Sequence, residues 1–145
     1  MKKFLFLDFD GVLHGDRDPH MAKLPLLEQY LLQMPQLDIV ISSTWREVHP
    51  LAKLQSMFPP SLRARVVGVT PILGLGYGTG PRQREIEAYL NQTNLPTTNT
   101  CWIALDDVNW FFDDACPNLI LVDPRRGFGH AEGGILLKWY GSAEA

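Results

Sequence analysis

The chain has only two cysteines, no long apolar run and no large excess of charge of one sign. The spacing of Cys101 and Cys116 matches no zinc or redox motif, so we expect free buried thiols rather than a disulfide. No apolar run approaches the roughly 18 residues that a membrane span needs, which predicts no membrane association. The net charge of -3 gives no general attraction to nucleic acid, so a polyanion would need a local basic patch.

The start of the chain has only part of a secretion signal. Lys2 and Lys3 precede an apolar stretch, but Asp8 and Asp10 interrupt it and no small-residue cleavage site follows. We therefore expect a cytoplasmic protein. The rest of the composition, 46% hydrophobic and 20% charged, is ordinary for a globular protein, and the length of 145 residues favours a single domain over residues 1–145.

Short apolar runs alternate with stretches of helical spacing. Strands are expected at 4–7, 37–41, 65–69, 101–105 and 119–122, and helices at 24–34, 45–58, 81–91 and 131–140. This alternation predicts an α/β fold: a single three-layer α/β/α Rossmann-like domain around a mainly parallel five-stranded sheet. The loop 74–80 has glycine at every second position, which matches neither a dinucleotide fingerprint nor a P-loop, and we expect a flexible loop beside the site.

Acidic residues follow the first and fourth expected strands. Asp8 and Asp10 come directly after the first strand, and Asp106 and Asp107 follow the fourth. Two such carboxylates repel each other by about 4 kcal/mol at an effective dielectric of about 20. A divalent cation such as Mg²⁺ would offset this repulsion, and ligands of open α/β sheets bind at this edge. The alternative for the second pair is an ordinary turn. A further pair, Asp113-Asp114, is typical of a solvated helix end.

Hydroxyl side chains follow the second expected strand. Ser42, Ser43 and Thr44 can bind phosphate oxygens together with free backbone N–H groups, or they can simply cap the next helix. On the helix 81–91, Arg82 and Arg84 offer guanidinium groups to phosphate, the alternative being a solvated helix face. Their spacing puts them on different faces, so we expect only one to point inward.

In this order along the chain, the motifs resemble the haloacid dehalogenase-like (HAD) superfamily. The motif Asp-x-Asp-Gly-x-Leu at 8–13 is the most specific of them, and Ser42, a basic residue on a later helix and an Asp-Asp pair follow it. A closer similarity is to the small HAD domains associated with Swiss-army-knife RNA repair proteins, through the segments 7–14, 42–46, 82–86, 105–107 and 122–124.

The resemblance implies a Mg²⁺-dependent phosphatase that works through an aspartyl-phosphate. Asp8 would be the nucleophile, and Asp10 would protonate the leaving oxygen and then activate water. Mg²⁺ would bind the Asp8 carboxylate, the Asp10 backbone carbonyl and the acidic pair, of which Asp106 is favoured over Asp107 as the direct ligand.

Two further roles follow from the resemblance. Ser42 would bind the transferring phosphoryl group, with Ser43 and Thr44 beside it in substrate binding. Arg82 would stabilise the charge on the phosphate, with Arg84 as the competing choice. The superfamily more often places lysine there, and because arginine cannot donate a proton its role must be electrostatic.

No separate cap domain fits between Asp10 and Ser42 or between Ser42 and Arg82, because the expected helices and strand use these segments. An open site admits the bulky ends of polymers, so we expect a phosphorylated substrate such as an RNA or DNA end. A non-catalytic phosphate-binding or protein-interaction module on the same scaffold is the alternative, and the sequence gives no indication of oligomeric state.

Basic and aromatic side chains could line such an open site. The candidates for a basic rim are Arg46, Arg63, Arg65, Arg82, Arg84, Arg125 and Arg126. The candidates for stacking on bases are Trp45, Tyr77 and Trp110, with core packing as the alternative for each. His14 lies near the first acid pair and could contact substrate, or it could simply face solvent from a loop.

Overall fold

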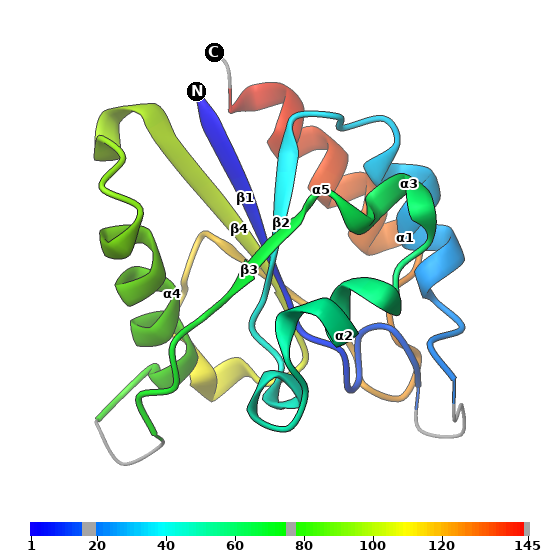
Figure 1. Ribbon diagram of the computed structural model, residues 1–145, viewed down its shortest axis with the longest axis horizontal. Coiled ribbons are helices and arrows are strands. Elements are labelled where there is room, and N and C mark those ends of the chain that lie inside the picture. The colour runs from blue at the N-terminus through cyan, green and yellow to red at the C-terminus, as the bar shows by residue number, and fades with distance from the viewer. Residues whose placement is uncertain (16–19, 75–77, 144–145) are drawn as a thin grey trace.

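Five strands form one parallel sheet in the computed structural model of the chain, which describes residues 1–15, 20–74 and 78–143 (Figure 1). The strands are β1 (Lys2–Leu7), β2 (Leu37–Ile41), β3 (Val66–Val69), β4 (Thr100–Asp106) and β5 (Leu119–Leu121). Their order across the sheet is β3-β2-β1-β4-β5, and every neighbouring pair is parallel. The predicted α/β fold with a five-stranded sheet is confirmed.

The helices follow the predicted pattern except for one division and one additional short helix at 60–63. They are α1 (Leu24–Leu31), α2 (Leu51–Ser56), α3 (Pro60–Arg63), α4 (Pro81–Gln92) and α5 (His130–Ser142), with 3₁₀ turns η1 (Thr44–Glu47), η2 (Thr97–Asn99) and η3 (Asn109–Phe111). The single helix expected at 45–58 is wrong: η1 ends before Pro50, and Pro50 precedes α2 in an extended conformation. Proline disfavours a helical conformation in the residue before it, which separates the two elements.

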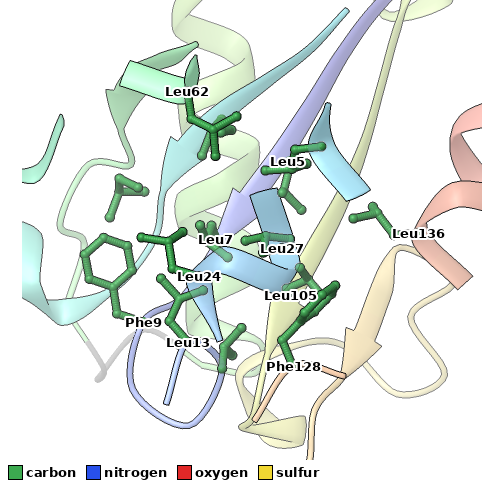
Figure 2. Close-up of a cluster of buried hydrophobic side chains, with 14 of the residues drawn as sticks. Leu5, Leu7, Phe9, Leu13, Leu24, Leu27, Leu62, Leu105, Phe128 and Leu136 are labelled. Carbon is green, nitrogen blue, oxygen red and sulfur yellow. The ribbon is translucent and has the colours of Figure 1, made fainter. Parts of the chain in front are cut away.

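Helices cover both faces of the sheet, in unequal numbers. Along β1, Leu5 and Leu7 belong to the larger hydrophobic cluster, which also includes residues of α1, α2, α3 and α5 (Figure 2). Phe4 and Phe6 belong to a smaller cluster with Ile86 of α4. Because successive side chains of a strand point to opposite faces, α4 covers one face alone and the other four helices cover the second. This is the predicted three-layer arrangement.

The order of the strands places the topological switch point of the sheet, which we call the crevice, at the carboxyl ends of β1 and β4. The chain runs outward from β1 through β2 to β3 and then returns to β4 on the other side of β1. The connections that leave β1 and β4 therefore diverge, which is the point where ligands bind in sheets of this kind. Leu7 pairs with both Ile41 and Leu105, so the next residues, Asp8, Ser42 and Asp106, lie at one level across three strands.

The described residues between Asp10 and Arg82 form α1, β2, η1, α2, α3 and β3 with their connecting turns, and this part of the chain contains no additional folded domain. No helix among the described residues is long and apolar enough to cross a membrane. Cys101 and Cys116 form no disulfide, and both are half-buried instead of buried as expected. Of the glycine-rich loop, residues 75–77 lie outside the described residues, and Tyr77 with them.

Candidate active site

Three carboxylates meet at the carboxyl ends of β1 and β4. Asp8, Asp106 and Asp107 each offer one oxygen, and these oxygens lie within 4.8 Å of one another. The Asp8 side chain is deep in the crevice, with 8% of the residue exposed, and Asp106 is 1% exposed. The backbone fixes both positions, because the Asp8 N–H donates to the Leu105 carbonyl at 3.1 Å and the Val122 N–H donates to the Asp106 carbonyl at 2.9 Å.

Gly11 allows the loop after β1 to pass close to this cluster. Its φ of +77° lies in the left-handed region, which glycine adopts without strain. A Cβ atom at this position would lie 2.3 Å from Asp107 Oδ2. Any other residue would therefore displace the Asp107 carboxylate, which explains why the acidic pair of the first motif is followed at once by glycine.

The crowding of the carboxylates changes their acidity. Burial raises the pKa of Asp8 well above its usual value, and the negative charges of Asp106 and Asp107 raise it further, while Arg82 partly opposes the change. Burial also raises the pKa of Asp106 to about 7, against the hydrogen bond from the Val108 N–H and the charge of Arg82. Both ionised forms therefore lack sufficient positive charge around them.

The residues present fit a divalent cation. Within the described part of the chain, Asp106 Oδ2 is fully buried and has no hydrogen-bond partner. The charged side chains of the site carry an excess of two negative charges when all are ionised: Asp8, Asp106, Asp107 and Glu85 against Arg46 and Arg82. A hard cation with oxygen ligands, such as Mg²⁺, would balance this excess.

The pKa of Asp106 predicts how stability depends on pH without metal. The pKa of Asp106 rises from 3.8 to about 7 on folding. Between these two pH values the Asp106 carboxyl therefore keeps its proton in the folded state and has lost it in the unfolded state. This contribution to stability is present at low pH and is lost as pH rises toward 7. Replacing Asp106 by Asn should remove this pH dependence. The free energy of unfolding of the variant, relative to that of the wild type, should therefore rise by on the order of a few kcal/mol between about pH 4.5 and 7.5.

Denaturant unfolding in EDTA at several pH values measures this difference. If Mg²⁺ binds at the cluster, it should stabilise the wild type by about 2.7 kcal/mol at a hundredfold excess over the dissociation constant, and the variant should lose this stabilisation. Equal pH dependence of the two proteins, or equal stabilisation by Mg²⁺, would contradict the assignment of Asp106 as a buried ligand.

Arg82 is the arginine that points into the site. Its side chain is buried, its Nη1 donates to Glu85 Oε1 at 2.8 Å, and its guanidinium lies 5.0 Å above the ring of Phe111. Arg82 Nε is 4.0 Å from Asp106 Oδ2, and this buried N–H has no hydrogen-bond partner among the described residues. The site thus contains a buried donor beside its carboxylates, which suits an oxygen of a phosphoryl group.

Arg84 points elsewhere, as the spacing predicts. It pairs with Asp113 at 2.6 Å and with Glu87 at 3.1 Å on the outer side of α4. Of the pair expected at a solvated helix end, Asp113 is half-buried in this ion pair, whereas Asp114 is exposed.

Arg46 and Ser43 support the site from behind instead of facing a substrate. Arg46 Nη2 lies 2.9 Å from Glu85 Oε1, and the same guanidinium donates to the carbonyls of Ser43 and Thr70 at 3.0 and 2.9 Å. Ser43 is buried, and its hydroxyl accepts from the Trp45 N–H as a cap of η1. The substrate-binding roles expected of both residues are not supported, because the Arg46 guanidinium is bound to internal partners and the Ser43 hydroxyl is buried. Thr44 is exposed at the start of η1.

Glu85 is the residue that sequence reasoning missed. Its Oε1 lies between Arg46 and Arg82, and its Oε2 accepts from the Leu73 N–H at 2.9 Å. One buried carboxylate thus ties together η1, the segment after β3 and α4. The spacing from Arg82 to Glu85 is typical of a helical ion pair and could have indicated half of this arrangement. Nothing local to Arg46 indicates the other half.

Asp10 lies at the mouth of the crevice, with 56% of its side chain exposed. Trp45 Nε1 donates to both of its carboxylate oxygens at 3.2 and 3.1 Å, and His14 Nε2 is 3.0 Å from Oδ1. The Trp45 ring also packs against Phe9, with centroids 5.5 Å apart. Trp45 therefore orients Asp10 and is not a free stacking face, and His14 contacts the carboxylate.

The predicted basic rim is only partly present. Arg65 donates to the carbonyls of Leu31, Met34 and Leu37 at the opposite edge of the sheet, and Arg63 donates to the Phe58 carbonyl. These two assignments were wrong for a shared reason: carbonyl groups at the ends of helices and strands need donors. Arg125 and Arg126 are exposed after β5 and both pair with Asp123.

The chain matches a known protein family over most of its length. The family described as "HAD domain in Swiss Army Knife RNA repair proteins" matches residues 4–132, which include every residue of the crevice. No curated protein and no solved structure matches the chain.

Proposed function

The chain belongs to the family of HAD domains in Swiss Army Knife RNA repair proteins, and from this premise we propose that it is a Mg²⁺-dependent phosphatase acting through an aspartyl-phosphate on Asp8. The observation that carries the proposal is the cluster of the buried Asp8 and Asp106 with the half-buried Asp107, and with Arg82 beside it. A carboxylate is a competent nucleophile toward phosphorus, and the buried Arg82 supplies positive charge for the phosphoryl oxygens.

Two displacements at phosphorus make up the proposed reaction. An Asp8 oxygen forms a bond to phosphorus while the bond from phosphorus to the leaving oxygen breaks, and Asp10 gives that oxygen a proton. Asp10 then takes a proton from water as the water attacks phosphorus, which releases inorganic phosphate and restores Asp8. The position of Asp10 at the mouth supports this role, since the leaving group and the water both have to enter from solvent.

The roles of the neighbouring residues follow from their positions. Asp8, Asp106 and Asp107 would hold Mg²⁺, with the Asp10 carbonyl as a further ligand implied by the family. When bound, Mg²⁺ would neutralise charge on the phosphoryl oxygens. Ser42, level with Asp8 on the neighbouring strand, would donate its hydroxyl to the phosphoryl group. Arg82 Nε, buried without a partner among the described residues, would donate to the same group.

We propose phosphorylated RNA or DNA ends as the substrates. The described residues include no cap domain over the crevice, and the matched family belongs to RNA repair proteins. A terminal phosphate on a polymer can enter a crevice of this kind without the chain having to fold around it.

Hydrolysis assays test the proposal. Purified protein should hydrolyse p-nitrophenyl phosphate with Mg²⁺, and EDTA should reduce the rate at least about a hundredfold, because the carboxylate cluster then lacks its counter-charge. A panel of 3′- and 5′-phosphorylated RNA and DNA oligonucleotides, nucleotides and sugar phosphates would identify the substrate, with the highest kcat/KM expected on an oligonucleotide end.

Two outcomes would contradict the proposal at different levels. Turnover of small metabolites with no turnover of oligonucleotides would reject the substrate class alone. Binding of a phosphate analogue with no Mg²⁺-dependent hydrolysis of any compound would reject the phosphatase and favour a non-catalytic phosphate-binding module.

A further inference from the structure

A hollow lies between the start of α4 and η3. It is a cavity of about 650 Å³, within the range of small-molecule sites. Its lining is formed by Gly78, Thr79, Arg84, Trp110, Phe112, Asp113 and Asp114. None of these residues except Arg84 has a place in the predicted phosphoryl chemistry, and Arg84 points away from the carboxylate cluster.

A short series of ring contacts joins this cavity to the active site. The ring of Phe111 lies 5.0 Å below the guanidinium of Arg82, and the Trp110 ring meets Phe111 edge-on with centroids 4.6 Å apart. Trp110 also follows Asp107, the residue directly after β4, by only three positions. A group bound on Trp110 would therefore be separated from Arg82 by a single aromatic ring.

Trp110 presents an open aromatic face. It is 63% exposed, whereas the other three tryptophans of the chain are partly buried, and Trp45 is used to orient Asp10. Phe111 supports its ring from one side. Nucleobases stack on such aromatic faces with little dependence on sequence, because every base has a π-face.

The charges around the cavity favour a base over a further phosphate. Asp113 and Asp114 place two carboxylates there, and Arg84 already pairs with Asp113 and Glu87. Carboxylates repel a phosphodiester but accept hydrogen bonds from the amino groups of bases. The occupant that fits is thus a neutral, flat ring with N–H donors at its edge.

We propose that this cavity binds the nucleobase of the terminal nucleotide whose phosphate enters the crevice, with the base stacked on Trp110. The inference rests on the proposed phosphatase function and extends it, since it gives the base of the terminal nucleotide a binding site of its own beside that of the phosphate. Arg82 and Trp110, joined through Phe111, would then fix the two ends of the same nucleotide.

Trp110→Ala tests the proposal with substrates that differ only in the base. On a phosphorylated oligonucleotide, at whichever end is hydrolysed, the variant should lose about 5- to 150-fold in kcat/KM, the range expected for one stacked base. On the same oligonucleotide with an abasic terminal nucleotide, variant and wild type should agree within about twofold. Trp110→Tyr should restore most of the lost kcat/KM. Ile135 is an exposed apolar residue on α5, and the control variant Ile135→Ala should leave kcat/KM on both substrates unchanged.

A binding measurement keeps the proposal testable if oligonucleotides are not hydrolysed. Nucleoside 3′- and 5′-monophosphates should quench the tryptophan fluorescence of the wild type in EDTA, and Trp110→Phe should abolish the quenching. Equal losses on the normal and abasic substrates, or quenching that persists in Trp110→Phe, would overturn the base site. Absence of hydrolysis together with Trp110-dependent quenching would reject the phosphatase and leave the base site supported.

Discussion

Replacing Asp8 by Asn is expected to reduce turnover at least about a thousandfold while the protein remains folded. The amide has the shape of the carboxylate but cannot form the bond to phosphorus. Because burial and the neighbouring carboxylates raise the pKa of Asp8, its ionised form is unfavourable in the metal-free protein, and the neutral amide should maintain or increase stability. Turnover of p-nitrophenyl phosphate and of a phosphorylated oligonucleotide, with thermal unfolding beside it, measures both effects.

Asp38→Asn is the matched control for this variant. Asp38 is a carboxylate at the start of β2, at the opposite edge of the sheet, where it pairs with Lys2. Its removal should leave turnover within about twofold of the wild type, since Asp38 lies at the amino end of β2, away from the carboxylate cluster at the carboxyl ends of the strands. A folded Asp8→Asn protein that keeps a tenth or more of the wild-type rate would exclude Asp8 as the nucleophile.

The second large effect is expected from Glu85. Glu85→Ala should lower the free energy of unfolding by about 3–5 kcal/mol, because it leaves two buried guanidinium groups without their carboxylate. Arg46 and Arg82 both lie within 3 Å of Glu85 Oε1, and all three side chains are buried. Urea unfolding at neutral pH measures the loss.

Glu87→Ala on the same helix provides the comparison. Glu87 pairs with Arg84, but both side chains are more than a third exposed, so this substitution should cost less than about 1 kcal/mol. Glu85→Gln should fall between the two, because it keeps an acceptor for the Leu73 N–H and removes the charge. Equal losses in Glu85→Ala and Glu87→Ala would show that the buried network does not contribute more than a surface pair.

These two expectations involve different parts of the same site. The Asp8 cluster is unfavourable on its own, because burial and mutual repulsion disfavour its ionised carboxylates, and a bound cation would relieve this electrostatic cost. The Glu85 network is internally paired and holds Arg82 beside that cluster. The internally paired Glu85 network therefore lies behind carboxylates whose charge is not balanced. This arrangement is expected where catalytic groups must be positioned before substrate arrives.

The fold was largely predictable because its signals are local. Each strand is a short apolar run. Asp8 and Asp10 come directly after β1, and a second acidic pair stands at the corresponding end of β4. Parallel strands place their carboxyl ends at one edge, so the meeting of Asp8 with Asp106 follows from the alternation of strands and helices. The division of the helix 45–58 at Pro50 was missed, although proline itself is a local signal.

The choice among the arginines was settled by the tertiary structure. Arg46, Arg65 and Arg82 are indistinguishable as cationic side chains in the sequence, yet the first two bind backbone carbonyls and only Arg82 lies beside Asp106. Helical spacing could separate Arg82 from Arg84 but could not say which of them faces the sheet. That depends on the face with which α4 packs on Phe4 and Phe6.

The sequence by itself therefore determined the sheet, its layers and the pair of acidic strand ends, because strand formation and apolar burial depend on patterns within a few residues of each position. Only the tertiary structure decided that Glu85 joins Arg46 to Arg82, that Trp45 holds Asp10, and that Trp110 stays exposed beside the crevice. These partners come from elements distant in the chain, and their contacts depend on how those elements pack rather than on any local pattern.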